Sequence, residues 1–281
     1  MLKYRANHTA AGPADWCNFL NDSRLFKNKK LSYLKTLGSG SDTMRVEEKR
    51  AVNRLVEAHG CQSHVMEGYG MTEVGSAACT NLPQCDVEGS VGDPLPKMTF
   101  CIWDNENNVE LEYYKKGEIC ISGPTLMNGY YNRIEETNAV LRYHDDGILW
   151  MHSGDFGYID ENGCVFLDGR MKRIIIQYNG MKINPFEIEK VLLNINDVSE
   201  CCVVGTPDKG HGRGSIPVAF IVSRNNSHSL VDLENRLRSA CETELQERYR
   251  PTRYFFIDSI PLTLNGKVDY RTLEEKAKKE Q

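Results

Sequence analysis

The stretch Gly68-Tyr69-Gly70-Met71-Thr72-Glu73 follows a short predicted strand, Ser63 to Met66, and runs into a turn. Glycines let a backbone approach a ligand closely, and the tyrosine between them could stack on a flat ring. The Thr72 hydroxyl could contact phosphate oxygens, and the Glu73 carboxylate could bind Mg²⁺. Taken alone, the stretch is better explained as a tight turn with a solvated glutamate, because short motifs match by chance.

The residues before this stretch predict one strand and one helix. Leu31 to Leu37 has a strand pattern and ends in the turn Gly38-Ser39-Gly40-Ser41-Asp42. Apolar residues then recur at helical spacing from Arg45 to His59, and Gly60 is a helix stop. Met1 to Lys30 shows weak periodicity and no clear strand, so it does not resemble the start of a domain.

The residues after Glu73 predict a sheet. From Cys79 to Asp168, short alternating segments are separated by clusters of Gly, Pro, Asn and Asp. This pattern is typical of an antiparallel, barrel-like or meandering sheet. A single helix near Ile134 to Leu141 interrupts it. The predicted strands are Met98 to Trp103, Glu118 to Ser122, Ile148 to Met151 and Cys164 to Leu167.

The order of elements changes at Asp168-Gly169-Arg170-Met171-Lys172, where we predict a domain boundary. Asn184-Pro185-Phe186-Glu187 has the residues of a helix start: an Asn N-cap, Pro at the first helical position and Glu three residues after the cap. Ser229 is predicted to cap a second, long helix, whose inward-facing residues are Leu230, Leu233, Leu237, Cys241 and Leu245. The other predicted elements are strands Arg173 to Tyr178, Glu200 to Gly205, Ile216 to Ser223 and Arg253 to Ile257, and a terminal helix, Arg271 to Lys279. Together they predict a compact α+β domain of about a hundred residues, a normal independent size.

Three further segments contain residues that could act on a ligand. In His152-Ser153-Gly154-Asp155, Asp155 could accept two hydrogen bonds from a ribose diol or could be a turn aspartate, and His152 is interpreted as a polar loop residue. Arg170 could pair with phosphate or ribose oxygens or belong to a solvated basic linker. Lys267, in the turn Pro261 to Asp269, could stabilise charge that develops during acyl and phosphoryl transfer. This turn is not a Walker loop, because proline and valine replace the required Gly and Ser/Thr.

Composition excludes several classes of function. The net charge is -5, so we expect no general attraction to nucleic acid or anionic membranes. No apolar stretch has the length of a membrane helix, and the first residues lack the pattern of a signal peptide. The 10 cysteines include no CxxC pair, which favours free, mostly buried thiols in the reducing cytoplasm over metal ligands or a disulfide framework. Cys201 and Cys202 are predicted to face opposite sides of a strand.

The motifs, in this order and at these separations, resemble those of the adenylate-forming (AMP-binding) superfamily, and acyl-CoA synthetases most of all. Lys116 to Gly123 with Gly129-Tyr130-Tyr131-Asn132, and Asn179 to Ile183 with Glu187 to Glu189, add to the resemblance, which spans about Leu31 to Leu273. It implies an α/β plus α+β fold: the remainder of a large sheet/barrel domain, residues 1–171, followed by a small mobile domain, residues 172–281.

The resemblance also implies a two-step reaction. A carboxylate attacks the α-phosphate of ATP to give acyl-AMP and pyrophosphate, and a thiol then takes the acyl group and releases AMP. The implied cofactors and substrates are ATP/AMP, Mg²⁺, a small carboxylic acid, and coenzyme A or a carrier-protein thiol. The resemblance implies that Tyr69 and Gly70 contact adenine, that Thr72 contacts phosphate and that Glu73 binds Mg²⁺. It implies that Asp155, with Arg170, binds the ribose, and that Lys267 is the lysine of the adenylation step. Lys172 is the implied hinge of the small domain, and the Gly180 loop is implied to lie beside the tunnel through which the thiol enters.

Three departures from the family pattern are visible. An adenine-contacting Gly-Gly-Ala segment of the family reads Gly40-Ser41-Asp42 here, so Gly40 and Ser41 are the implied contacts. The loop from Arg170 to Gly180 is one residue longer, and Gln177 stands where a basic residue is frequent. The Gly/Ser/Thr-rich phosphate loop ending in Lys is absent from the 281 residues. We therefore expect Met1 to lie inside the large domain and a missing N-terminal half to supply that loop.

Several readings stay open. The chain ends soon after Lys267 without a carrier module, which favours CoA as the acceptor, but free-standing adenylation domains end there too. A non-catalytic nucleotide-binding or interaction module of the same fold is a further reading. Fatty, aromatic and amino acids all remain candidate substrates, so fatty acid metabolism is only one setting for this chain.

Overall fold

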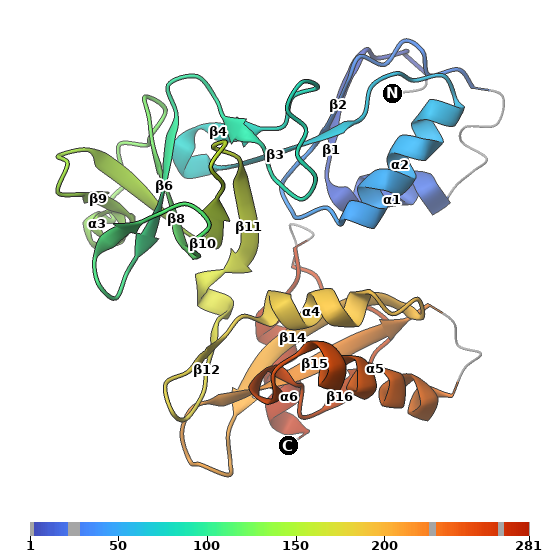
Figure 1. Cartoon of the computed structure of the whole chain (residues 1–281), viewed down its shortest axis with the longest axis vertical. Helices are drawn as coiled ribbons and strands as arrows, with labels where there is room; N and C mark the ends of the chain where they lie inside the picture. Colours follow the sequence, from blue (N-terminus) through green and yellow to red (C-terminus); the bar gives the residue numbers. More distant parts are fainter. Residues whose placement is uncertain (1–2, 22–28, 225–228, 264–266, 281) are drawn as a thin grey trace. The chain divides into compact units, whose positions relative to one another are not determined.

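The computed structural model describes residues 3–21, 29–224, 229–263 and 267–280. The chain divides into two compact units, Met1–Leu167 and Asp168–Gln281, and Figure 1 shows the elements of each. The boundary that the sequence suggests, after Met171, stays a prediction. Within the described residues, no helix combines the length and apolar character needed to cross a membrane.

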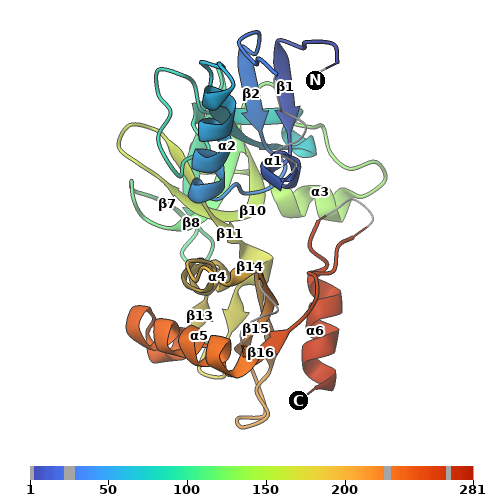
Figure 2. The same cartoon turned by 90° about the vertical axis from the view of Figure 1, so that its right-hand side faces the viewer.

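The first unit begins with a five-stranded sheet in the order β1-β2-β3-β4-β5. Its strands are β1 (His8–Ala11), β2 (Thr36–Ser39), β3 (Val65–Met71), β4 (Ser76–Thr80) and β5 (Asp93–Pro94). The first three are parallel, and β4 pairs antiparallel with both β3 and β5. Helices α1 (Pro13–Asn21) and α2 (Val46–Ala58) pack together beside β1 and β2 (Figure 2). The core that they share with the sheet includes Trp16, Leu37, Val52 and Val65.

The prediction of no clear strand before Lys30 is wrong. β1 has only four residues, and its register with β2 pairs His8 with Thr36, far along the chain. Such a strand forms because a distant partner completes its hydrogen bonds, and local periodicity does not reveal it. The predicted strand from Leu31 is also too long, since β2 begins at Thr36 and Leu31 is buried in a turn.

The second sheet has the order β11-β10-β8-β6-β7, and β9 also pairs with β10. Its strands are β6 (Thr99–Asp104), β7 (Val109–Leu111), β8 (Gly117–Ser122), β9 (Leu141–Tyr143), β10 (Leu149–Ile159) and β11 (Val165–Arg170). The pairings β6/β7, β6/β8, β8/β10 and β9/β10 are antiparallel. The predicted antiparallel meander and the helix α3 (Ile134–Val140) are confirmed. The barrel-like alternative is wrong, because the sheet formed by the described residues is open.

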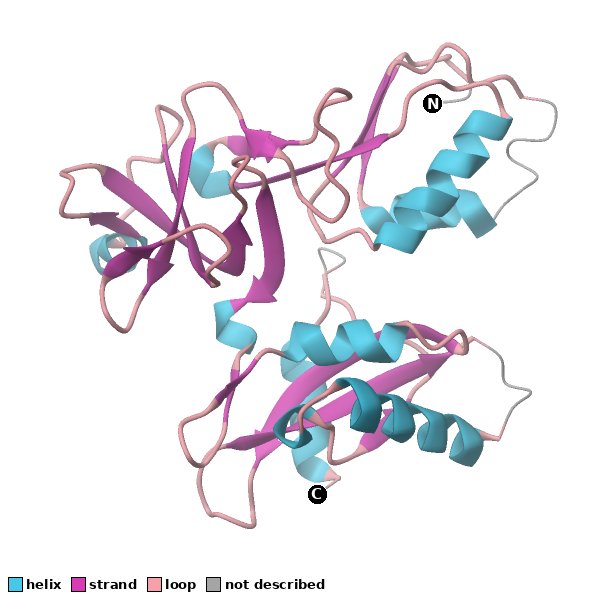
Figure 3. Cartoon of the chain, viewed as in Figure 1, coloured by secondary structure: helices cyan, strands magenta, loops and turns pink. Residues whose placement is uncertain are grey.

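The second unit contains a three-stranded sheet of β14 (Val198–Pro207), β15 (Ser215–Ser223) and β16 (Tyr254–Phe256). Helices α4 (Pro185–Leu193) and α5 (Leu230–Glu244) lie on one face, and α6 (Tyr270–Lys279) lies on the other (Figure 3). Val203, Ala219 and Ile221 pack with residues of α4 and α5, whereas Cys202, Val204 and Phe220 pack with α6 on the opposite face. The predicted opposite orientations of Cys201 and Cys202 are therefore confirmed. The unit also has a two-stranded antiparallel sheet of β12 (Ile175–Ile176) and β13 (Lys182–Ile183).

The two predicted helix starts have different outcomes. Asn184 caps α4 as predicted, since its side-chain oxygen accepts a hydrogen bond from the Phe186 backbone N–H at 3.1 Å. Ser229 precedes α5 but makes no side-chain capping bond, and Leu230 is exposed instead of facing inward. The other predicted inward positions Leu233, Leu237 and Cys241 are buried, so the stripe of α5 is confirmed from Leu233 onward.

Candidate functional site

The centre of the candidate site is a hydrogen bond between two of the predicted ligand-binding residues. The Tyr69 hydroxyl in β3 donates to Oδ2 of Asp155 in β10 at 2.7 Å. Both side chains are buried, with 9% of Tyr69 and 5% of Asp155 exposed. Burial, and then the negative charge of Asp155, raise the pKa of Tyr69 well above its usual value. Tyr69 is therefore a neutral donor that holds the carboxylate in place.

A strand irregularity positions Asp155. The register between β10 and β8 shifts between His152 and Phe156, and Asp155 lies inside this bulge. The Ser153 hydroxyl accepts a hydrogen bond from the Asp155 backbone N–H at 3.0 Å. Bulges commonly redirect a side chain next to a functional site, and this one directs the carboxylate toward β3.

The glycines on either side of Tyr69 allow β3 and β4 to approach closely. A Cβ at Gly70 would lie 1.8 Å from the Ser76 carbonyl oxygen, and one at Gly68 would lie 3.2 Å from the Cys79 carbonyl oxygen. Only glycine fits at the first position without moving backbone. The close pairing of β3 with β4 therefore requires glycine at position 70. The sequence alone indicated only that Gly70 could let the backbone approach a ligand.

Thr72 and Glu73 follow β3 in a single 3₁₀ turn, Thr72–Val74. Thr72 is exposed, and Glu73 is partly buried. Glu73 Oε1 accepts a hydrogen bond from the Tyr130 hydroxyl at 2.7 Å, which raises the pKa of Tyr130 to about 12. The sequence contained Tyr130 in the Gly129–Asn132 motif, but nothing in its spacing revealed this contact. Glu73, like Asp155, is a carboxylate held by a tyrosine hydroxyl.

The loop after β2 brings Gly40 close to β3. A Cβ on Gly40 would lie 3.3 Å from the Gly68 carbonyl oxygen. Ser41 has a φ of 74°, in the left-handed region that favours glycine. The position where the family pattern has a glycine thus keeps a glycine-like backbone, although it is occupied here by serine.

His152 is not a polar loop residue, and that interpretation is wrong. It lies in β10, is 3% exposed, and its Nδ1 is 2.8 Å from Glu118 Oε2. Burial alone would raise the pKa of Glu118, but hydrogen bonds from His152 and Asn105 outweigh it and lower the pKa. The misreading came from the following Ser-Gly, which suggests a turn but here belongs to the bulge.

The second unit contains the remaining predicted residues. Arg170 is the last residue of β11, and Lys172 is exposed in the 3₁₀ turn Met171–Arg173. Gly180, with a φ of 81°, lies in the turn between β12 and β13. Lys172 and Gly180 both line a cavity of about 810 Å³ that also contains Arg213 and Lys278. This cavity is basic, and the sequence patterns did not predict it.

Lys267 is exposed and follows residues that lie outside the described part of the chain. Its backbone N–H donates to Thr263 Oγ1 at 3.2 Å, and its carbonyl oxygen accepts from the Thr263 N–H at 2.7 Å. These bonds close the turn that presents the lysine. Lys267 and Tyr69 belong to different units.

Comparison with known proteins agrees with the fold and the motifs. Residues 1–131 match the model of the AMP-binding enzyme family, and residues 187–267 match that of the AMP-binding enzyme C-terminal domain. The chain is 32% identical to 4-coumarate–CoA ligase 1 of Glycine max over 88% of this chain and 81% of that protein. It is also 32% identical to luciferin 4-monooxygenase of Nipponoluciola cruciata, over 92% of this chain and 45% of that protein.

The solved structures give the same result. ATP-bound MatB from Rhodopseudomonas palustris has a TM-score of 0.84 and 28% identity, and the match covers 99% of this chain and 52% of that one. Fold and motifs therefore define an adenylate-forming protein. The chain belongs to the AMP-binding enzyme family, and it spans about half the length of the first curated relatives that it matches.

Proposed function

We propose that the protein containing this chain activates a carboxylic acid with ATP, forming acyl-AMP and pyrophosphate, and then transfers the acyl group to the thiol of CoA. The observation that carries the proposal is the buried Tyr69–Asp155 hydrogen bond of 2.7 Å. It joins two motifs that are separated by 86 residues in the sequence. Each motif is ambiguous alone, and their meeting in one unit supports a common ligand.

The proposed nucleotide contacts follow from the chemistry of these side chains. A carboxylate in the position of Asp155 can accept hydrogen bonds from two ribose hydroxyls, and such charge-assisted bonds are strong. Arg170 would assist at the ribose, Thr72 would contact phosphate, and Gly40 and Ser41 would lie at the adenine. Lys267 would stabilise the charge that develops on the reacting phosphate and carboxylate oxygens.

Glu73 fits the requirements of a magnesium ligand. Mg²⁺ is commonly bound through one or two carboxylates together with substrate phosphates and waters. Glu73 supplies one partly buried carboxylate, which the Tyr130 hydroxyl orients. When bound, the ion would neutralise phosphate charge. The chain's own contribution is to fix the direction of that carboxylate.

The basic cavity of the second unit fits the phosphate groups of coenzyme A. Lys172, Arg213 and Lys278 line it, and each is exposed enough for its cation to reach a ligand. Lys172 would also be the hinge of a small mobile domain, and the Gly180 turn would contact the thiol arm. All ten cysteines are free thiols in the structure, which supports a cytoplasmic location.

Nucleotide binding by the 281-residue chain tests the first part of this proposal. We expect Asp155→Asn to weaken AMP binding about 10- to 150-fold in calorimetry, the equivalent of one lost charged hydrogen bond of ~1.5–3 kcal/mol. The matched control is Asp145→Asn, which changes an exposed aspartate of the β9–β10 turn. This variant should bind AMP as tightly as the unaltered chain does. Equal AMP affinity in all three proteins would contradict the role of Asp155.

The reaction itself is tested by acid-dependent ATP–pyrophosphate exchange. These 281 residues contain no phosphate loop, so we expect the chain to bind AMP without catalysing exchange. Robust exchange by the purified chain would overturn this expectation. In a protein that contains the loop, Lys267→Ala should abolish acyl-AMP formation and largely spare transfer of the acyl group from supplied acyl-AMP to CoA. Equal loss of both half-reactions would contradict the role of Lys267.

A second candidate function is nucleotide binding without catalysis. The Tyr69–Asp155 pair is formed within residues that lack a phosphate loop, which favours retention of ribose contacts when triphosphate contacts are absent. Binding of AMP without any exchange, in a protein that also contains the loop, would favour this function over the ligase. An acceptor other than CoA, such as a carrier-protein thiol, would appear as acyl transfer to that thiol alone.

A further inference from the structure

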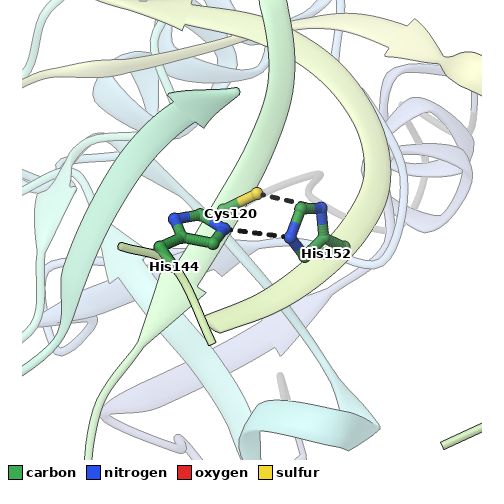
Figure 4. A group of neighbouring side chains, drawn as sticks. All are labelled: Cys120, His144 and His152. Atoms are coloured by element: carbon green, nitrogen blue, oxygen red, sulfur yellow. Dashed lines mark hydrogen bonds between the residues drawn. The ribbon is translucent and has the colours of Figure 1, made fainter. Parts of the chain in front are cut away.

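Three side chains of types that can bind a metal ion lie together at the second sheet of the first unit (Figure 4). They are Cys120 of β8, His144 of the turn after β9, and His152 of β10. Nε2 of His144 is 3.0 Å from Nε2 of His152, and Cys120 Sγ is 3.4 Å from Nδ1 of His152. One possible ligand atom from each residue lies within 4.8 Å of the other two. Nothing in the proposed ligase reaction uses these residues.

Glu118 orients the more deeply buried histidine. Its Oε2 is 2.8 Å from His152 Nδ1, and its side chain also accepts bonds from Asn105 at 2.7 Å and from the Gly154 backbone N–H at 2.9 Å. With Nδ1 donating to a fixed carboxylate, the lone pair of His152 is on Nε2, the nitrogen that faces His144. A carboxylate–histidine pair of this kind commonly supports a metal ligand.

Two tryptophans hold the second histidine. The ring of His144 stacks on Trp103 with centroids 3.7 Å apart and on Trp150 with centroids 5.4 Å apart. His144 is nevertheless only partly buried, so an ion from solvent can reach the cluster from its side. The stacking fixes the plane of the ring and leaves Nε2 directed at His152.

The distances and charges suit a zinc-like ion. With Zn–N bonds of about 2.0–2.1 Å and a Zn–S bond of about 2.3 Å, tetrahedral ligand atoms lie roughly 3.3–3.6 Å apart. The Nε2 atoms of His144 and His152, 3.0 Å apart, lie close to this spacing. Cys120 Sγ lies 3.4 Å from Nδ1 of His152, so its side chain has to turn toward Nε2 to complete the site. The Cys120 thiolate and the Glu118 carboxylate carry the two negative charges that balance a divalent cation, because both histidines bind in the neutral form.

We propose that Cys120 Sγ, His144 Nε2 and His152 Nε2 bind a Zn²⁺-like divalent ion, with Glu118 as the supporting carboxylate and water as a fourth ligand. On coordination the thiol loses its proton to solvent. The ion joins β8, the β9–β10 turn and β10, and so steadies the bulge that presents Asp155. None of its ligand residues is among the proposed nucleotide contacts.

Titration of the reduced, metal-free 281-residue chain with Co²⁺ tests the site directly. We expect 1:1 binding with a thiolate-to-cobalt charge-transfer band in the near ultraviolet, displaced by Zn²⁺. Cys120→Ser should lose that band. His144→Phe, which keeps an aromatic ring between the tryptophans, should weaken binding by at least about 100-fold, and Glu118→Gln by about 10- to 100-fold.

Two matched controls distinguish this site from other thiols and histidines. Cys101 is a buried thiol directly opposite Cys120 in the β6–β8 register, so Cys101→Ser should keep the band. His64→Ala removes an exposed histidine of the same unit and should bind Co²⁺ normally. Circular dichroism of each variant shows whether it is folded, and His144→Phe remains informative if substitution of the buried residues unfolds the chain.

Specific results would overturn the proposal. They are the absence of a charge-transfer band in the unaltered chain, a band that persists in folded Cys120→Ser, or equal affinity in His144→Phe. Each would mean that the cluster is only a hydrogen-bonded part of the core.

Discussion

Replacing Lys49 by methionine should destabilise the first unit strongly, because Lys49 is a buried cation between two carboxylates. Its Nζ is 3.2 Å from Glu67 Oε2 and 2.7 Å from Asp86 Oδ1. Only 7% of the Lys49 side chain and 10% of the Glu67 side chain are exposed. Glu67 lies in β3 immediately before Gly68, so this ion triad attaches α2 to the strand that carries Tyr69.

The expected loss is large relative to the stability of a domain. Removing one partner of a buried pair costs about 3–5 kcal/mol, because it leaves an uncompensated buried charge. For a protein of this size, that corresponds to a fall in melting temperature of roughly 6–20 °C. Arg50→Met is the matched control on the same helix. Arg50 pairs with Glu88, but both side chains are about half exposed, so its loss should cost only about 0–1 kcal/mol.

The pH dependence gives a second test. Burial raises the pKa of Glu67 above its ordinary value of 4.5, and the Lys49 ammonium group only partly opposes this. At pH values between the pKa of Glu67 in the unfolded chain and its raised pKa in the folded chain, the folded state binds more protons. Glu67 therefore contributes increasing stability as the pH falls through this range. Lys49→Met removes the opposing cation and raises the pKa of Glu67 further. The loss of stability should therefore be greatest near pH 7 and become smaller toward pH 5.

Urea unfolding followed by tryptophan fluorescence measures these differences, since Trp16 lies in the core that α2 covers. The double variant Lys49→Met/Glu67→Gln should regain most of the stability lost in Lys49→Met, because it leaves no unpaired charge at Glu67. A loss below about 1 kcal/mol in Lys49→Met, equal to that of an exposed ion pair, would refute the reasoning. So would a loss that is the same at pH 5 and pH 7.

Three further predictions concern the candidate site and its loops. Tyr69→Phe should lower the free energy of unfolding by ~1.5–3 kcal/mol in urea, since it removes a hydrogen bond to the buried Asp155 carboxylate; a loss under about 0.5 kcal/mol would contradict that bond. Ser41→Gly should raise the melting temperature slightly. Relief of the left-handed backbone conformation at position 41 is worth roughly 1–2 kcal/mol, which exceeds the entropy cost of glycine, about 0.5–1 kcal/mol. A lower melting temperature would count against backbone strain at Ser41. Gly70→Ala should cost about 3 kcal/mol or more or prevent folding, because its Cβ would overlap the backbone of Ser76; wild-type stability by circular dichroism would disprove the close approach.

Local patterns predicted the longer elements of the second unit well, because these have many periodic residues or clear start signals. The predicted strand Arg173 to Tyr178 is wrong in extent, since only Ile175–Ile176 forms a strand there. The helix start at Asn184 and the strand over residues 216–223 needed only capping chemistry and β-branched, apolar composition. The short strand His8–Ala11 was missed because its stability comes from a partner distant in the sequence. The resemblance to the family identified Asp155 as a candidate ribose-binding residue. Only the fold showed that the Tyr69 hydroxyl donates a hydrogen bond to its carboxylate.

The errors around His152 have the same physical origin. Ser-Gly after a histidine predicts a turn, and the bulge in β10 uses those same residues while keeping hydrogen bonds on both sides. His144 is separated from His152 by eight residues and reaches it only because β9 and β10 pair as neighbours. No motif spacing contains that information, since it depends on strand register and on the aromatic stacking of His144.

The two carboxylates of the candidate site are fixed in the same way. Asp155 accepts from the Tyr69 hydroxyl and Glu73 accepts from the Tyr130 hydroxyl, each at 2.7 Å. The Tyr69 ring packs in the core while its hydroxyl reaches the acceptor, and Tyr130 does the same from a partly buried position. Holding the acceptors in place before a ligand arrives reduces the ordering that binding requires. Under the proposed function, the stability of these tyrosine–carboxylate pairs and the affinity for a nucleotide would therefore both depend on the same hydrogen bonds.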